Sequence, residues 1–275
     1  MDRKRIILAT TGAFYFAASL SAQVFSFNEL NVAYGQDFND YRGSEATLPQ
    51  YFSVSWDEGR ITPPDDPFTG VGDFATSDPD TSYGAFTAFT SDNSDFSFGI
   101  RERAPVDLRD ARLFFAFTNN TGSPISSFEV SYDVEAWFIG DRRNRIRLKY
   151  DTMLDSPDRD TFEEDIFSTD NPSSEMTVGT KVDGSLAANR TTVSGTVDLT
   201  TLDDGTGEMF FGALGPGETA YFRWQFSNTD GDGGSLRSGL AINNLSVTAI
   251  PEPSVYAAVG GLFALVLVCL RRRRR

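Results

Sequence analysis

The chain has 275 residues, with 24 Lys and Arg against 39 Asp and Glu, and it contains no histidine. Without histidine, Ser-His-Asp and Cys-His catalysis and histidine-based zinc sites are excluded. The excess of negative charge repels phosphate backbones, which argues against nucleic-acid binding.

The first 22 residues predict a secretory signal peptide. Arg3, Lys4 and Arg5 form a positive start, residues 6–20 are uncharged and mostly apolar, and small residues follow at Ser21 and Ala22. These are the three parts of such a peptide, in order. An uncleaved signal anchor is the alternative. We expect the secretion translocon as a partner and residues 23–250 as the exported domain.

This domain is more acidic than the whole chain. Outside residues 1–22 and 251–275, Lys and Arg fall from 24 to 16 and Asp and Glu from 39 to 37, which leaves a net charge of −21. The only cysteine, Cys269, lies beyond it, so the domain has no disulfide. Its length is enough to bury a core without disulfides or a structural metal.

Several segments alternate apolar and polar residues as half-buried strands do. The clearest are residues 128–138, 192–199 and 219–226. Residues 113–117 form a short aromatic run that suits a buried strand. Residues 240–247 predict a final strand with a bulge at Asn243-Asn244. Earlier strands are suggested near Phe25 and at residues 51–54. We expect residues 155–174 to form a long loop and no segment to sustain an amphipathic helix. The pattern predicts an all-β fold, a single β-sandwich (jelly-roll-like) domain.

Residues 141–150 contain the one basic run of the domain, with Arg143, Arg145, Arg147 and Lys149 on one strand face. Two interpretations are open. The run is a stripe for an anionic exopolysaccharide, or it forms a hairpin with residues 128–138. In the hairpin, keeping the apolar faces together sets the basic face opposite Glu129, Asp133 and Glu135. We favour the hairpin.

The loop after residue 227 resembles a calcium loop in its spacing. Asn228, Asp230 and Asp232 fall at alternate positions, and Gly233 takes the sixth place, where calcium loops turn sharply. The loop departs from the pattern at Asn228, which replaces an aspartate, and at Gly239, which replaces a bidentate glutamate. An acidic turn before the last strand is the favoured interpretation, and calcium is left open.

Tryptophan residues and paired acids are the candidates for sugar binding or catalysis. Trp224 lies on an apolar strand face and is expected in the core, whereas Trp137 lies on a polar face and is the candidate for an exposed, sugar-stacking ring. Glycoside hydrolysis needs two carboxylates and no histidine. The adjacent pairs at 163–164 and 203–204 lie in polar contexts that would not raise a pKa, so no enzyme activity is expected.

The last 25 residues have three parts. Pro251, Glu252 and Pro253 are followed by an uncharged stretch at 254–270, which at helical rise spans roughly 25 Å and predicts a transmembrane helix. A basic block that stays in the cytoplasm ends the chain, formed by Arg271, Arg272, Arg273, Arg274 and Arg275. An ordinary permanent anchor is the alternative.

This order resembles the PEP-CTERM sorting signal of exported Gram-negative bacterial proteins, over residues 251–275 only. The resemblance implies recognition by an exosortase, removal of the tail, and delivery from the inner membrane to the cell surface or an exopolysaccharide matrix. Residues 114–249 are similar to a secreted β-domain that recurs in such proteins. Because such domains mostly have no assigned biochemical activity, this resemblance supports the fold more than the function. The matching residues are Asn120-Thr121-Gly122, Tyr132, Glu135, Trp137, Arg223-Trp224, Gly239-Leu240-Ala241-Ile242 and Leu245-Ser246-Val247.

The sequence thus predicts an exported structural or adhesive protein of the cell surface or matrix, without enzyme activity or a required cofactor. A carbohydrate-binding module of the matrix is the alternative, and a carboxylate-based glycoside hydrolase is less favoured. Exopolysaccharide is left open as a partner. The tail does not discriminate among these functions, because it only directs sorting.

Overall fold

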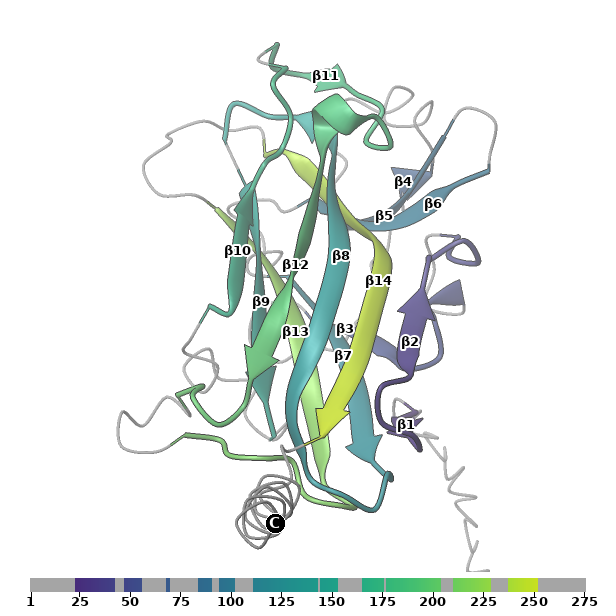
Figure 1. Ribbon diagram of the computed structural model, residues 1–275. Helices are drawn as coiled ribbons and strands as arrows, with labels where there is room; N and C mark the ends of the chain where they lie inside the picture. Colours follow the sequence, from purple (N-terminus) through teal and green to yellow (C-terminus); the bar gives the residue numbers. More distant parts are fainter. Residues whose placement is uncertain are drawn as a thin grey trace, which may run out of the picture.

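In the computed structural model, two β-sheets pack face to face (Figure 1). The structure describes residues 23–42, 47–55, 68–69, 84–90, 94–101, 111–142, 144–152, 165–175, 177–203, 210–228 and 237–251. The predicted signal peptide, Glu252 and Pro253, the predicted transmembrane helix at 254–270 and the final arginines lie outside these residues. The all-β sandwich predicted for the domain is confirmed.

The first sheet has six strands in the described part of the chain. Its order is β1-β7-β13-β9-β10, and β3 also pairs with β7; only β1 and β7 run parallel. The strands are β1 (Phe25–Phe27), β3 (Phe52–Ser55), β7 (Arg112–Asn119), β9 (Asn144–Asp151), β10 (Phe167–Asp170) and β13 (Thr219–Asn228).

The second sheet has eight strands among the described residues, in the order β11-β8-β14-β6-β5-β4. In addition, β12 pairs with β8 and β2 pairs with β14. The strands are β2 (Ala33–Gln36), β4 (Phe68–Thr69), β5 (Gly84–Phe89), β6 (Phe96–Arg101), β8 (Ile125–Ile139), β11 (Thr180–Lys181), β12 (Arg190–Asp198) and β14 (Gly239–Pro251). The 3₁₀ helix η3 (Ala187–Asn189) follows β11, and no helix in the described part of the chain is long and apolar enough to cross a membrane.

The clearest strand predictions are confirmed by β7, β8, β12, β13 and β14. The predicted bulge is also present, because the register of β14 on β8 shifts between Asn243 and Ser246 and Asn244 has a φ of 51°. The long loop expected at 155–174 is wrong in part, since Phe167–Asp170 forms β10 against β9.

Aromatic side chains fill the space between the sheets. The ring of Phe117 lies 5.1 Å from that of Phe128 and 5.2 Å from that of Phe222, so strands of both sheets meet there. Trp224 is fully buried, which confirms its predicted place in the core. Offset and edge-on ring pairs at such distances contribute beyond the area they bury, and they fix how the two sheets face each other.

The predicted hairpin between residues 128–138 and 141–150 is wrong. β8 lies in the second sheet beside β12 and β14, whereas β9 lies in the first sheet beside β13 and β10. The physical reason is that alternation determines which side chains face the core and leaves the neighbouring strand undetermined. Two strands that follow each other in sequence can face each other across the sandwich as readily as pair in one sheet.

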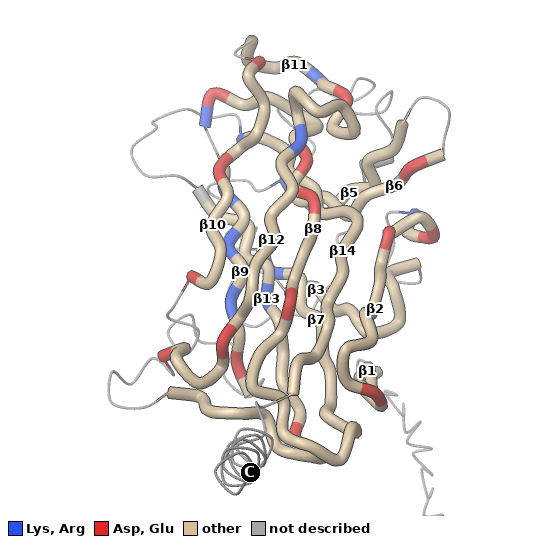
Figure 2. Tube along the Cα trace, viewed as in Figure 1, with Lys and Arg blue, Asp and Glu red and all other residues tan. Residues whose placement is uncertain are grey.

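The basic face of β9 accordingly has other partners. Lys149 Nζ lies 3.1 Å from Asp165, and Arg145 Nε lies 3.2 Å from Asp170 at the end of β10. Arg147 Nε lies 3.5 Å from Asp165. Figure 2 shows basic positions on β9 in the rear sheet and acidic positions on β8 in the front sheet. The described basic side chains are therefore matched by local acids, and Arg143 lies outside the described residues.

Candidate functional site

The outer face of the second sheet carries the candidate site. There β12, β8, β14 and β2 lie side by side (Figure 1). Their outward residues form rows across the strands, because directly paired residues on neighbouring antiparallel strands share a face. One row consists only of small residues: Ser194, Ser131, Ser246 and Gly35.

Taller side chains stand on both sides of this row. Two residues along the strands in one direction, the next row contains Thr196, Glu129 and Thr248. Two residues in the other direction stands the pair Thr192 and Asp133. The space over Gly35 is open, since a Cβ added there would meet no atom within 4 Å. A low row between two higher ones makes a groove that crosses the strands.

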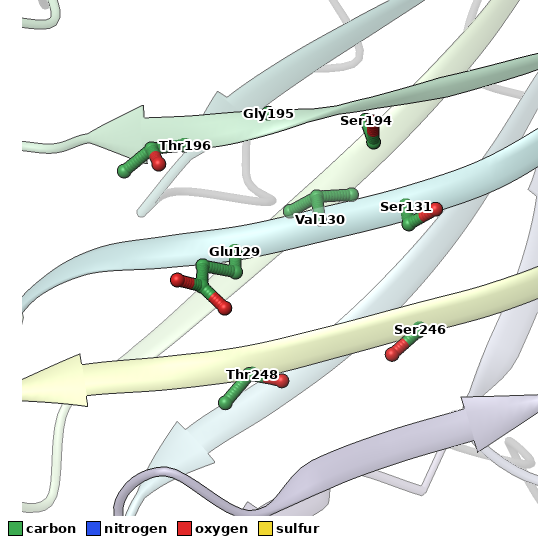
Figure 3. Close-up of a pocket in the computed structure, with 8 residues that line it drawn as sticks. All are labelled: Glu129, Val130, Ser131, Ser194, Gly195, Thr196, Ser246 and Thr248. Carbon is green, nitrogen blue, oxygen red and sulfur yellow. The ribbon is translucent and has the colours of Figure 1, made fainter.

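We call this hollow the outer-face groove. Its volume is about 360 Å³, and Figure 3 shows two rows of side chains that cross three strands. The lining residues are Glu129, Val130, Ser131, Ser194, Gly195, Thr196, Ser246 and Thr248. Five of the eight carry a hydroxyl group and one carries a carboxylate. Apart from Val130 and Gly195, the lining can donate or accept hydrogen bonds.

Asp133 stands beside the groove, outside its lining, and is held in place by its neighbours. Thr192 Oγ1 donates to Asp133 Oδ1 over 2.5 Å, and Asn244 Nδ2 donates to Asp133 Oδ2 over 2.9 Å. Arg190 lies 3.8 Å from the same Oδ2 atom. Asn244 contributes because the bulge in β14 turns it outward. Both oxygens of Asp133 are thus engaged, which fixes a negative charge beside the hydroxyl rows.

A buried carboxyl lies two residues further along β8. Glu135 has no exposed surface, and it accepts hydrogen bonds from Trp137 Nε1 at 2.9 Å and from Asn243 Nδ2 at 3.4 Å. Burial, which disfavours the charged form, raises the pKa of Glu135 to about 7. Hydrogen bonds from Trp137, Ser97 and Asn243 lower that pKa, and the charge of Asp95 raises it.

The expectation that Trp137 presents an exposed ring is wrong. Only 2% of its surface is exposed, and it belongs to a small cluster with Phe86, Ala88, Phe138 and Ala241. Gly184 lies directly on the indole, because a Cβ added there would fall 2.4 Å from Nε1. The outward face of the second sheet is therefore covered at this end, and Trp137 offers no platform for a sugar.

The remaining candidates are only partly described. Asn228 ends β13 and Pro251 ends β14, whereas Asp230, Asp232, Glu252 and Pro253 lie outside the described residues. Among the described residues, no group of three Asp, Glu or Cys side chains is placed to hold a metal ion. Calcium binding by the loop after β13 stays a prediction.

The groove itself was missed by sequence reasoning. Its hydroxyls come from residues 131, 194–196 and 246–248, which are far apart in the chain and meet only through the order β12-β8-β14. The available signal was the run of small hydroxyl residues at the outward positions of three predicted strands. Using it requires the cross-strand register, which alternation within one strand does not contain.

No family model and no curated protein matches the chain. Among solved structures, the K1 cleaved adhesin domain of Lys-gingipain from Porphyromonas gingivalis W83 is similar at 9% identity and TM-score 0.41, covering 79% of this chain and 98% of that one. The xylan-binding module CBM15 is 11% identical at TM-score 0.37, with coverage of 81% and 99%. The CBM22-1 xylan-binding domain of Paenibacillus barcinonensis Xyn10C is 7% identical at TM-score 0.36, with coverage of 82% and 98%. All three TM-scores are below 0.5, so we argue the function from this chain's own residues.

Proposed function

We propose that this chain is an exported, non-enzymatic β-sandwich that binds a neutral polysaccharide in the outer-face groove. The observation that carries the proposal is the lining of the groove, where five hydroxyl side chains and Glu129 face one shallow hollow on an open sheet face. Retention on such a polysaccharide would make the protein an adhesive component of a surface matrix.

The chemistry of the lining fits a chain of sugar hydroxyls. Serine and threonine both donate and accept hydrogen bonds, and the carboxylate of Glu129 accepts them. The row from Ser194 to Gly35 crosses four strands, which spans roughly 14 Å at the usual strand spacing. Glu129 in the lining and Asp133 beside it make this part of the face negative, so a neutral polymer suits the groove better than an anionic one.

The same residues argue against hydrolysis. A pKa of about 7, as Glu135 has, would suit a general acid. However, Glu135 is fully buried and bonded to Trp137, so it cannot reach a bound glycosidic oxygen. Asp133 has both oxygens engaged by its neighbours. We therefore assign binding to this face and no bond cleavage.

A larger side chain inside the groove should weaken polysaccharide binding. Ser131 is the central residue of the low row, so Ser131→Leu places a branched apolar group between Ser194 and Ser246 and removes one hydroxyl. We expect at least tenfold weaker binding, equivalent to about 1.4 kcal/mol. The measurement is affinity electrophoresis of the purified protein through gels that contain xylan, mannan or β-glucan, with alginate as the anionic comparison.

Ser168→Leu is the matched control, because Ser168 is exposed on β10 in the other sheet. It should migrate as the unmodified protein does in every gel. If no neutral gel retards the unmodified protein, or if both leucine variants lose retardation equally, the groove is not a polysaccharide site.

A second proposal concerns the tail, because β14 runs up to the sorting motif. Pro251, the first residue of the motif, still pairs with Ile125 of β8. We propose that an exosortase recognises the motif and removes the segment beyond it, which would leave every described strand of the sandwich intact. The supporting features are the resemblance of residues 251–275 to a PEP-CTERM signal and this position of Pro251.

The tail proposal predicts a shortened protein outside the inner membrane. In cells with an exosortase, the mature mass should lack the helix at 254–270 and Arg271 to Arg275, and the protein should fractionate with the surface or matrix. In cells without the exosortase, it should keep Arg275 and stay in the inner membrane. Mass spectrometry of the C-terminal peptide decides between these, and an intact tail in both strains contradicts the proposal.

A further inference from the structure

Strand β12 forms an open edge of the second sheet. It pairs with β8 through nine consecutive residues, Arg190 to Asp198, and no strand in the described part of the chain pairs with its other side. Native edge strands are commonly protected by a bulge, a proline or an inward-pointing charge. β12 has an unbroken register and contains no proline, and both of its charges lie on the outward face. Its free edge is therefore suited to pairing.

The backbone groups of this edge alternate in a known direction. Leu199, which follows β12, donates its N–H to the carbonyl oxygen of Ser126 over 2.9 Å. In the register of β12 on β8, Leu199 stands opposite Ser126, so the odd-numbered residues bond to β8. The N–H and C=O groups of the even-numbered residues Thr192, Ser194 and Thr196 consequently point away from β8, toward the free edge.

The side chains of β12 are arranged symmetrically about Ser194. Arg190 and Asp198 stand four residues before and after it, and Thr192 and Thr196 stand two residues before and after it. All five lie on the outward face, since they alternate with Val193 and Val197. An antiparallel copy of β12 centred on Ser194 would therefore set each arginine opposite the aspartate of the other copy.

We propose that two copies of this chain associate edge to edge through antiparallel β12 strands, with the two-fold axis at Ser194. The three central residues of each copy would exchange about six backbone hydrogen bonds across the axis. Two Arg190–Asp198 pairs, one at each end, would define the register, because a shift by two residues separates both pairs. The contact is isologous and closes at two copies.

The pairing would also join the two binding faces. Ser194, Gly195 and Thr196 of β12 line the outer-face groove, so the grooves of the two copies would meet at the new strand pair. One polysaccharide chain could then contact both copies, which raises its apparent affinity. This consequence rests on the proposed function, whereas the pairing itself rests on β12 alone.

Disulfide capture at the axis tests the pairing. In an antiparallel hydrogen-bonded pair the Cα atoms lie about 5.5 Å apart, a distance that a disulfide can bridge. The only native cysteine is Cys269, so the full chain with Cys269→Ala and Ser194→Cys has one thiol. After mild oxidation at low micromolar concentration in detergent, we expect a dimer on a non-reducing gel. Ser246→Cys, on a strand paired on both sides, should stay monomeric.

Charge exchange supplies the second arm of the test. On the Ser194→Cys background, Arg190→Asp or Asp198→Arg alone places like charges opposite each other and should lower the dimer fraction at least fivefold. The double exchange should restore it. Within one copy, Arg190 lies 3.8 Å from Asp133, and Asp198 accepts the N–H of Thr200. The double exchange disrupts both of these contacts, so recovery reports pairing between copies.

Far-UV circular dichroism of each variant confirms that it is folded. The proposal is overturned if Ser194→Cys gives no dimer, if a different protein is captured in its place, or if the charge variants leave the dimer fraction unchanged. Ser131→Leu should dimerise normally, so a failure of the groove proposal and a failure of the pairing proposal give different results.

Discussion

Replacing Glu135 with glutamine should make the protein more stable above pH 7 and leave its stability almost unchanged near pH 4. Glu135 is fully buried on β8 and bonded to Trp137 and Asn243. Burial raises its pKa from an ordinary value of 4.5 to about 7. The charge of Asp95, which precedes β6, raises this pKa further, whereas Arg190, the cross-strand neighbour of Glu135 on β12, has its guanidinium 3.8 Å from Asp133.

The sign is obtained by comparing the folded and unfolded states. Because the folded pKa lies above the unfolded one, the folded protein binds this proton more tightly. The resulting stabilisation is fully present below about pH 4.5 and is lost as the pH rises through about 7. A shift of this size corresponds to about 3 kcal/mol of unfolding free energy. Glutamine is neutral at every pH, so the unfolding free energy of the variant does not fall at this position as the pH rises.

Urea unfolding of both proteins at pH 4, 5.5 and 8 measures the effect. The difference in unfolding free energy between Glu135→Gln and the unmodified protein should grow by about 3 kcal/mol from pH 4 to pH 8. Glu129→Gln is the matched control on the same strand face, because Glu129 is exposed there. Identical pH dependence for the unmodified protein and Glu135→Gln would mean that this carboxyl is not buried in the native state.

Alternation within residues 128–138 correctly assigned the two faces of β8. Phe128, Val130 and Tyr132 are buried between the sheets, and Glu129 and Ser131 face outward. Alternation contains no information on what covers the outward face. At one end of β8 that face is open and forms the groove, while at the other end Gly184 covers Trp137, which belongs to a buried cluster with Phe86. The same polar pattern therefore predicted exposure for Trp137 and was wrong.

Which strands pair with each other was the second feature that the sequence did not predict. The basic face of β9 needed acidic partners, and three were available on β8 at Glu129, Asp133 and Glu135. The structure uses Asp165 and Asp170 instead. The bulge at Asn243-Asn244 was predictable from local sequence. The hydrogen bond that the bulge allows, from Asn244 to Asp133, was not predictable, because it depends on β14 lying beside β8.

Truncating Trp137 should produce the largest loss of stability outside the main core. Trp137→Ala removes a large buried ring from beneath Gly184 and deprives Glu135 of its indole donor. Large-to-small changes of an aromatic at a buried site cost about 3–5 kcal/mol. Thermal and urea unfolding measure this loss. The folded fraction should still migrate slowly through the neutral polysaccharide gels, because Trp137 does not line the groove.

Trp137→Phe separates the contribution of ring packing from that of the hydrogen bond to Glu135. Phenylalanine keeps most of the packing and lacks the N–H, so its cost should be about 1–3 kcal/mol and should increase with pH as Glu135 ionises without its donor. If Trp137→Ala instead abolished retention on neutral polysaccharide while leaving the unfolding free energy unchanged, the ring would be a ligand contact. The site would then lie at the opposite end of β8 from the groove, and Ser131→Leu would bind normally.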